Sequence, residues 1–436
     1  MRKIIQYMMM ALIAVVLASC ANDISEESTP TVKSNIRFVV DDFPMFEKPS
    51  TRTIGEEDKG KTAWAVGDEI CVKLESKELG TQTATLKYNG VKFEIQDGNS
   101  LCYLEGEPVT AYAYYAPNRR WRNGSLDFKD IFGNPNGTAE FLEATCTVHY
   151  GDNNYVDISF ANATRNYSRL RIATIPKTEI KVDADNFAPT DNPNLLYMTY
   201  TLTSDEKGNA YLYGTFDNNS IVTVKYREAT LATHTFLQKT ENAKSYALDA
   251  SIISLAGEGI TYNQIEEDVK KELDAGKTYI NLILAPDADE ETLDAIHNGL
   301  AGARSWTINL TLIGCKKIPY GGFMYWKMLK SIALPDVTEI GENAFSDCSG
   351  LQKVVLGNLT KVYGNVGKKG IFDGCRTKDI DLVLSKDQKV MNGGKTEGGC
   401  CWTADITKDY SGSDEHNGRV FLDYDFQSIT CVYPVP

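Results

Sequence analysis

The chain has 436 residues, more than one hydrophobic core usually holds, so two or three domains are expected. Its formal net charge of −14 at pH 7 argues against nucleic acid and against anionic membrane surfaces as partners. An apolar content of 42% is normal for a soluble globular protein, and the 23 Tyr and 34 Gly favour β structure with many turns.

Residues 1–19 have the pattern of a signal peptide. Arg2 and Lys3 precede an apolar run that is shorter than the ~20 residues a spanning helix needs. The run leads into Leu17-Ala18-Ser19-Cys20, which resembles the lipobox of bacterial lipoproteins. The resemblance implies cleavage before Cys20, lipidation of its sulfur and attachment to a membrane without a spanning helix. The alternatives are an uncleaved helix and an ordinary secretory signal.

Residues 20–34 are polar and acidic, and we expect them to form a flexible tether. Acidic residues such as Glu26 and Glu27, placed soon after a lipidated cysteine, resemble the export signals of surface lipoproteins in Gram-negative bacteria. A generic acidic linker is the alternative. The expected location is the outer membrane of a Gram-negative bacterium, with the protein at the cell surface.

Residues 35–250 read as short strands separated by turns, which predicts two β-sandwiches over 35–157 and 158–250. Asn89-Gly90 is a typical tight hairpin turn, because both residues tolerate positive φ. The expected strands and hairpin cover 36–40, 87–95, 110–115, 155–160, 168–175, 211–216 and 221–226.

The same region carries an ordered set of motifs. They are Thr51-Arg52-Thr53, Trp64-Ala65-Val66-Gly67-Asp68, Ala111-Tyr112-Ala113-Tyr114-Tyr115-Ala116-Pro117, Val156-Asp157-Ile158-Ser159-Phe160 and Arg169-Leu170-Arg171-Ile172. Together, and behind a lipobox, they resemble the fimbrillin-like lipoproteins. That resemblance implies all-β sandwich domains of transthyretin-like topology. It also implies that polymerising members are cut after an Arg and joined by donated strands.

Arg52 is the nearest candidate for such a protease-processing site, and a surface Arg in the Thr-Arg element is the alternative. The chain continues for almost 190 residues beyond the fimbrillin-like region. A tethered monomer or a terminal subunit is therefore expected in preference to a stalk subunit.

Residues 251–436 begin with helical patterns. A helix capped by Thr261 or Asn263 and closed by Gly276 is predicted, followed by a strand at 279–284. A second helix over 289–300 and a strand over 306–312 come next, with a strand-to-strand step of 28 residues. We expect these helical segments to cap the N-terminal end of a repeat.

A 22-residue repeat follows. Ile318, Phe323, Leu329, Ile332 and Leu334 recur 22 positions later as Ile340, Phe345, Leu351, Val354 and Leu356. A fixed period of this length predicts a solenoid, in which each turn buries its apolar face against its neighbours. A last step of 28 residues leads from Leu356 to Leu384. The aromatic C-terminal end is expected to close the stack.

The turn from Val337 to Leu351, with Ile340-Gly341-Glu342-Asn343-Ala344-Phe345 at its centre, is similar to the BspA-like leucine-rich repeat. The resemblance implies an α/β leucine-rich-repeat solenoid over 251–436. It also implies a surface protein that adheres to host matrix proteins or to other cells.

Ten Cys are present, and an odd number remains once Cys20 is lipidated. None has CxxC spacing, so no zinc or redox motif is predicted. Cys348 and Cys375 occupy equivalent places in adjacent turns. They predict either a ladder of buried thiols or a disulfide between turns.

The four His lack a His or Cys neighbour at metal-ligand spacing, and no catalytic or nucleotide-binding motif occurs. We therefore expect no enzyme activity, metal or cofactor. Tyr325 and Trp326 fall outside the apolar template of the repeat, and they are the candidates for ligand contact. A packed corner of the repeat is the alternative.

These patterns predict a multidomain, non-enzymatic surface lipoprotein. Its leucine-rich repeat surface would bind a protein or glycan on host or neighbouring cells. The first alternative is an accessory or tip subunit of a fimbria-like polymer, with fimbrial subunits as partners. A surface glycan-binding protein or a cryptic polysaccharide hydrolase is the second alternative.

Overall fold

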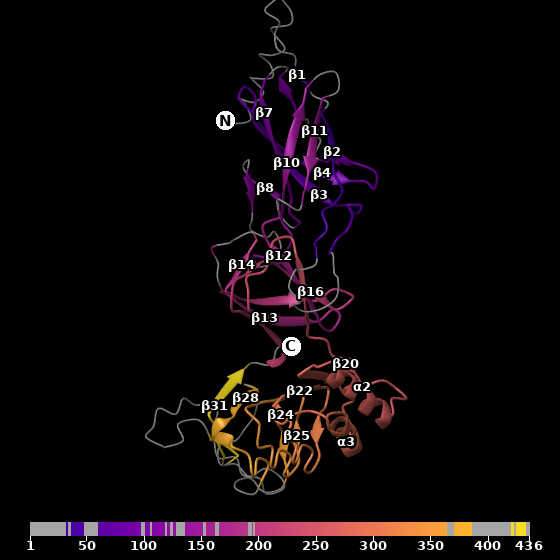
Figure 1. Ribbon diagram of the computed structural model, residues 1–436, viewed down its shortest axis with the longest axis vertical. Helices are drawn as coiled ribbons and strands as arrows, with labels where there is room; N and C mark the ends of the chain where they lie inside the picture. Colours follow the sequence, from indigo (N-terminus) through magenta and orange to yellow (C-terminus); the bar gives the residue numbers. More distant parts are fainter. Residues whose placement is uncertain are drawn as a thin grey trace, which may run out of the picture.

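The computed structural model describes residues 32–33, 36–47, 60–96, 101–104, 107–117, 120–122, 125–127, 136–150, 154–161, 165–190, 194, 197–363, 370–385, 420–422 and 424–432. They form three units that lie end to end in Figure 1: an N-terminal unit over 32–167, a middle unit over 168–250 and a C-terminal unit over 251–432. Each unit contains its own large cluster of buried apolar side chains.

The N-terminal unit is all β. Its strands are β1 (Val32–Lys33), β2 (Arg37–Val40), β3 (Glu69–Ser76), β4 (Gly80–Tyr88), β5 (Phe93–Ile95), β6 (Tyr103–Leu104), β7 (Val109–Tyr115), β8 (Arg120–Arg122), β9 (Ser125–Asp127), β10 (Leu142–His149) and β11 (Tyr155–Ser159). The main sheet has the order β2-β11-β10-β7-β3-β4-β5. Residues 142–144 of β10 pair with β7, whereas residues 145–149 pair with β11. Phe38 of β2 and Val72 of β3 share one core, so the two halves of this sheet pack face to face.

The middle unit is a sandwich of two four-stranded sheets. Its strands are β12 (Ser168–Ala173), β13 (Glu179–Asp185), β14 (Phe187–Pro189), β15 (Tyr197–Thr203), β16 (Asn209–Phe216), β17 (Ser220–Tyr226), β18 (Ala229–Phe236) and β19 (Ser245–Asp249). The sheets have the orders β14-β16-β12-β19 and β15-β13-β17-β18. Leu170 and Ile172 of the first sheet share a core with Val182 and Val224 of the second.

A buried charge of the N-terminal unit lies beside its junction with the middle unit. The Arg165 side chain forms an ion pair with Glu140, and its guanidinium carbon lies 3.8 Å from the centre of the Phe46 ring. Next to Phe46, the Glu47 amide donates to the Ala243 carbonyl at 2.9 Å, and its carbonyl accepts from the Ser245 amide. Removing a charge from water is costly unless it is paired, so the Arg165–Glu140 pair fixes the Phe46 ring within the N-terminal unit. The hydrogen bonds of Glu47 then join that unit to the middle one.

The C-terminal unit combines two helices with two parallel sheets. Its elements are β20 (Ile253–Ser254), α2 (Tyr262–Asp274), β21 (Tyr279–Ile283), α3 (Glu290–Gly299), β22 (Ile308–Ile313), β23 (Lys317–Ile318), β24 (Leu329–Leu334), β25 (Glu339–Ile340), β26 (Lys353–Leu356), β27 (Lys361–Val362), the 3₁₀ turn η2 (Thr377–Asp379), β28 (Asp381–Ser385), β29 (Val420–Phe421), β30 (Tyr424–Asp425) and β31 (Ser428–Val432). The larger sheet has the order β20-β21-β22-β24-β26-β28-β31, and the smaller one β23-β25-β27. β29 and β30 form an antiparallel pair.

The 22-residue period of the sequence matches the strand pairing in both parallel sheets. Ser331 pairs with Asn309 before it and with Lys353 after it, in steps of 22. The final 28-residue step is also correct, because Val354 pairs with Leu382. The predicted 28-residue step at the start is wrong, because Ile280 pairs with Leu310, 30 positions later. A two-residue slip keeps the same side chains inward, so the apolar pattern alone could not fix that register.

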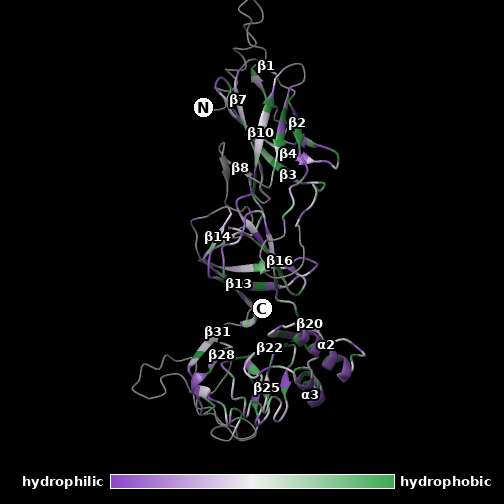
Figure 2. Ribbon diagram, in the orientation of Figure 1, coloured by the Kyte–Doolittle hydropathy of each residue, from purple (hydrophilic) through white to green (hydrophobic). Residues whose placement is uncertain are grey.

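The helices begin where the capping signals predicted. The Thr261 side chain accepts from the Gln264 amide at the start of α2, and Asp289 caps α3 in the same way. In Figure 2 both helices are largely hydrophilic, consistent with a position at the end of the stack. Their apolar residues, such as Val269 and Ile296, are buried in the C-terminal core.

The repeat core contains a ladder of aromatic rings. Phe345 stacks between Phe323, at 5.4 Å between ring centres, and Phe372, at 5.1 Å. Tyr424 and Phe426 then meet Phe372 edge-on, so the aromatic C-terminal end closes the stack as expected. Trp402, which belongs to the same aromatic C-terminal region, lies outside the described residues, as does the segment 364–369 within the last 28-residue step.

The expected strands of 35–250 all have counterparts in the structure, including the hairpin around Asn89. Its loop is longer than the predicted tight turn, because Tyr88 pairs with Phe93, and Asn89 does not share the positive φ of Gly90. The proposed boundary between residues 157 and 158 falls inside β11, which pairs with both β10 and β2. The core of the N-terminal unit also includes Phe160 and Tyr167. A short apolar strand such as β11 carries no local sign of the sheet to which it belongs.

We expect Phe345→Ala to destabilise the C-terminal unit by about 3–5 kcal/mol, because it removes a fully buried ring that stacks on both sides. Chemical denaturation monitored by circular dichroism would measure this loss. Phe345→Leu, which leaves a smaller cavity, should cost clearly less. Equal midpoints for wild type and Phe345→Ala would contradict the ladder's structural importance.

Candidate binding surface

The outward side of the larger parallel sheet carries a row of small or polar side chains. In register across the strands, the row consists of Asn281, Thr311, Ala333, Val355 and Val383. Thr311 is 1% exposed although it points away from the core of the repeat. Something other than the repeat itself therefore covers this row.

The cover is the β18 edge of the middle unit. Ala229 of β18 is fully buried in one small cluster with Ala333 and Val355. Farther along the strand, the Leu231 carbonyl accepts a hydrogen bond of 3.0 Å from the Asn281 amide group. Because Ala333 and Val355 are short, the backbone of β18 can approach the sheet closely. The strand face of the repeat is thus an internal contact between units.

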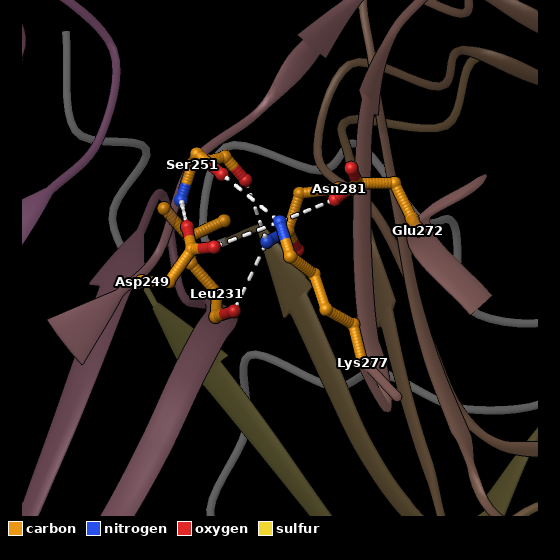
Figure 3. A network of polar contacts seen from close by, with 6 residues as sticks. All are labelled: Leu231, Asp249, Ser251, Glu272, Lys277 and Asn281. Carbon is orange, nitrogen blue, oxygen red and sulfur yellow. Dashed lines mark hydrogen bonds and ion pairs between the residues drawn. The ribbon is translucent and has the colours of Figure 1, made fainter. Parts of the chain in front are cut away.

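Figure 3 shows the polar network at one end of this contact. Asn281 also donates to the Ser251 carbonyl at 3.2 Å, and the Lys277 ammonium lies 2.8 Å from the Asp249 carboxylate and pairs with Glu272. Burial tends to lower the pKa of Lys277, but the bonds to Asp249 and Glu272 outweigh it and raise that pKa. The network ties the chain crossing between the two units to both of them.

The β17–β18 turn supplies a second polar contact. Arg227 and Glu228 both have positive φ, as a two-residue hairpin turn requires. Arg227 donates to one oxygen of Asp336 at 2.7 Å, and the Gly314 amide donates to the other at 2.9 Å. Asp336 therefore links the tip of this hairpin to the loop that follows β22.

We expect Ala333→Arg to separate the middle and C-terminal units without unfolding either one, because a long charged side chain cannot fit beneath β18. An unpaired buried charge costs several kcal/mol, so the contact would open before the cores yield. Small-angle X-ray scattering should show a larger radius of gyration.

Lys330→Glu is the matched control, since Lys330 lies on the same strand with an exposed side chain. It should leave the scattering profile unchanged. An unchanged profile for Ala333→Arg would contradict the contact.

With the strand face covered, the exposed aromatic side chains gather on the turns of the repeat. Trp306, Tyr320 and Tyr325 are 55%, 61% and 57% exposed. All three lie against the segment 343–350. The Tyr320 hydroxyl accepts from the Asn343 amide group at 3.0 Å, and the Tyr325 amide donates to the Ser346 carbonyl at 2.9 Å. We call these three residues the aromatic edge.

The Trp306 ring rests directly on Gly350. A Cβ added to Gly350 would come within 1.7 Å of Trp306 Cδ1, so only glycine permits this position of the ring. The alternation of β22 would place Trp306 on the core side with Ile308, and the sequence therefore gave no sign of its exposure. Trp306 lies just before β22 and has a φ of +64°, so it is not in the extended conformation of the strand and its side chain turns outward.

The predicted contact residues have different outcomes. Tyr325 is exposed, as expected. The prediction that Trp326 is exposed is wrong. Its side chain is 4% accessible, stacks on His297 with 4.9 Å between ring centres and meets Phe323 edge-on. Its spacing of three residues from Phe323 within one turn places both rings on the buried side. Cys20 and Arg52 lie outside the described residues.

The thiols of the repeat form a ladder. Cys348 donates to the Phe323 carbonyl and Cys375 to the Phe345 carbonyl, both at 2.9 Å. Both cysteines are free, so the interpretation as buried thiols holds and the disulfide does not form here. Burial raises the pKa of Cys375 to about 12, which keeps it protonated and unreactive.

Among the described residues, no three His, Cys, Asp or Glu side chains come together in a group able to hold a metal ion. Over the same residues, none of the helices combines the length and apolar character that crossing a membrane requires.

No family model matches the chain, and no curated protein matches it. Among solved structures, a candidate cell adhesion protein from Bacteroides fragilis is 12% identical, with a TM-score of 0.22; the match covers 50% of this chain and 92% of that one. The minor pilin GBS52 from Streptococcus agalactiae is 8% identical over 50% of this chain and 95% of its own, with a TM-score of 0.17. The shaft pilin SpaA from Lactobacillus rhamnosus GG is 12% identical over 51% and 98%, with a TM-score of 0.19. Similarity at this level carries no argument about function.

Proposed function

We propose that this chain is a non-enzymatic adhesive protein of the bacterial cell surface, anchored through lipid on Cys20. The N-terminal and middle units would be two β-sandwich domains that hold the C-terminal unit away from the outer membrane. The C-terminal unit would be a short, BspA-like leucine-rich repeat domain. Its partner would be a protein or glycan on a host or neighbouring cell.

The observation that carries the proposal is the division of the repeat into a covered face and an exposed edge. The Thr311–Ala333 face is buried beneath β18, whereas the aromatic edge remains accessible. The unit that carries it lies at the end of the molecule opposite the N-terminal unit. Exposed Trp and Tyr side chains are the residues most often found at recognition hot spots. Leucine-rich repeats would thus serve as a scaffold, with contact made from the turns.

The architecture also suits display. The three units lie end to end, and charged or hydrogen-bonded contacts fix each joint, through Glu47 in one and through Arg227 and Lys277 in the other. If Cys20 carries lipid, the N-terminal unit is nearest the membrane and the repeat is farthest from it.

We expect Cys20→Ala to abolish incorporation of labelled fatty acid and to move the protein from the membrane fraction to the medium, because the thiol is the site of lipid attachment. Cells expressing this variant should bind host matrix or partner cells no better than cells lacking the protein. Cys71→Ala, a control that removes a buried thiol, should keep both lipid and adhesion. Labelling of Cys20→Ala, or adhesion that is independent of the wild-type protein, would refute the proposal.

A second candidate function is that of an accessory or tip subunit of a fimbria-like polymer. One observation favours it: β2 is the edge strand next to β11, and it precedes Arg52 in the chain. Phe38 of β2 and the nearby Phe43 are buried in the core of the N-terminal unit. A cut after Arg52 would free this segment, and a strand donated by another subunit could replace it.

If this second function holds, cells should contain a form that begins after Arg52, and Arg52→Ala should prevent its appearance. Immunoblots of unheated surface extracts would show high-molecular-mass ladders for wild type and none for Arg52→Ala. Finding only intact monomer in both strains would eliminate polymerisation.

A further inference from the structure

The composition of the exposed apolar surface differs between the two halves of the chain. Among the described residues after 250, the large apolar side chains that are well exposed are all aromatic: Tyr262, Trp306, Tyr320 and Tyr325. The exposed aliphatic ones, such as Val91 and Leu237, all precede residue 240. Among its described residues, the C-terminal unit therefore presents flat aromatic rings to solvent and no well-exposed large aliphatic side chain.

Two of these rings sit on unfavourable backbone. Tyr325 has a φ of +68° and Trp306 a φ of +64°, a left-handed conformation that is rare for bulky residues. Asp347 occupies the place of Tyr325 in the next turn, and Gly374 follows in the turn after that. Asp and Gly are residues that tolerate positive φ. The fold would be satisfied by Gly, Asn or Asp at position 325, so an exposed Tyr there needs another reason.

The neighbours of the aromatic edge are polar. Asn343 bonds to the Tyr320 hydroxyl and accepts from the Ser346 hydroxyl, and Asp347 lies on the same turn. The Trp306 ring rests on Gly350 at the end of that turn. Flat rings beside amide, hydroxyl and carboxylate groups complement a sugar, whose ring has an apolar C–H face and an edge of hydroxyls. The formal net charge of −14 disfavours anionic sugars. At the edge itself, Asp347 is offset by the exposed Lys327, whose carbonyl accepts from the Trp306 amide.

We propose that the aromatic edge is a carbohydrate-binding site for neutral oligosaccharides, in which Trp306 and Tyr325 stack on sugar rings and Asn343 bonds to hydroxyls. The inference rests on the proposed adhesive function for its biological setting. Its evidence is independent of that function, because it comes from backbone strain and from the kind of side chain exposed.

The test uses the full-length protein and defined probes. Cellohexaose and chitohexaose are the neutral probes, and 3′-sialyllactose and a heparin hexasaccharide are the anionic ones. Isothermal titration calorimetry should detect binding of a neutral probe and none of the anionic probes. Tyr325→Asn and Trp306→Ala should each weaken that binding by at least about tenfold, the loss that corresponds to about 1.4 kcal/mol.

Two further variants sharpen the result. Gly350→Ala should also weaken binding, since the added methyl group displaces the Trp306 ring while every aromatic residue remains. Tyr262→Ala should bind normally, because it removes an exposed ring that lies outside the aromatic edge, at the start of α2.

Thermal unfolding separates recognition from structure. Tyr325→Asn should be at least as stable as wild type, because Asn tolerates the left-handed backbone that strains Tyr. A clear drop in its melting temperature would mean that Tyr325 is structural and would overturn the proposal.

Absence of binding to both neutral probes, binding of the anionic probes alone, or equal binding by Tyr325→Asn and Trp306→Ala would also overturn it. If no sugar binds but the protein still supports adhesion, the proposed adhesive function would stand, with a protein as its ligand. Sugar binding by a protein that supports no adhesion would instead reject the proposed function and keep the site.

Discussion

The packing of β18 on the outward row of the parallel sheet is the contact on which the arrangement of this molecule depends. A strand can lie this close to a sheet only where the side chains between them are short, and Ala229, Ala333 and Val355 meet that condition. Burial of Thr311 and Asn281 follows from it. The hydrogen bond from Asn281 to the Leu231 carbonyl satisfies a backbone group that this burial would otherwise leave unpaired.

This contact redirects the question of function. Repeat proteins often use a long, regular surface for binding, and the strand face would be the obvious choice here. It is already occupied by the molecule's own middle unit. What remains is the row of turns, where the ladder Phe323, Phe345 and Phe372 fixes the backbone from inside and allows single residues to vary outside. The residues of the aromatic edge are such outward positions, on turns whose inward side packs in the core.

The two joints use polar chemistry in different ways. At the first joint, the Glu47 backbone exchanges hydrogen bonds with Ala243 and Ser245. Beside it, within the N-terminal unit, Arg165 is enclosed with Glu140 and the Phe46 ring, so its charge is compensated where water cannot reach it. At the second joint, the apolar cluster of Ala229, Ala333 and Val355 is flanked by partly exposed pairs such as Arg227–Asp336 and Lys277–Asp249. Exposed pairs contribute little stability but define orientation, and the apolar row contributes the burial. The contacts at both joints therefore define the relative orientation of the units as well as holding them together.

The sequence by itself determined the features that depend on neighbours along the chain. The helix starts at Thr261 and Asp289, the hairpin at Asn89 and the 22-residue register all follow from local capping, turn preference and periodicity. Tertiary structure decided which outward surfaces stay in water. The repeat template predicts an exposed Trp326, which is buried against His297. The strand pattern predicts an inward Trp306, which turns outward. The physical reason is that an apolar pattern tells which way a side chain points from its own strand or turn. The pattern does not say whether another unit packs against that side chain. Nor does it say whether one residue in the left-handed conformation has turned the side chain to the opposite side.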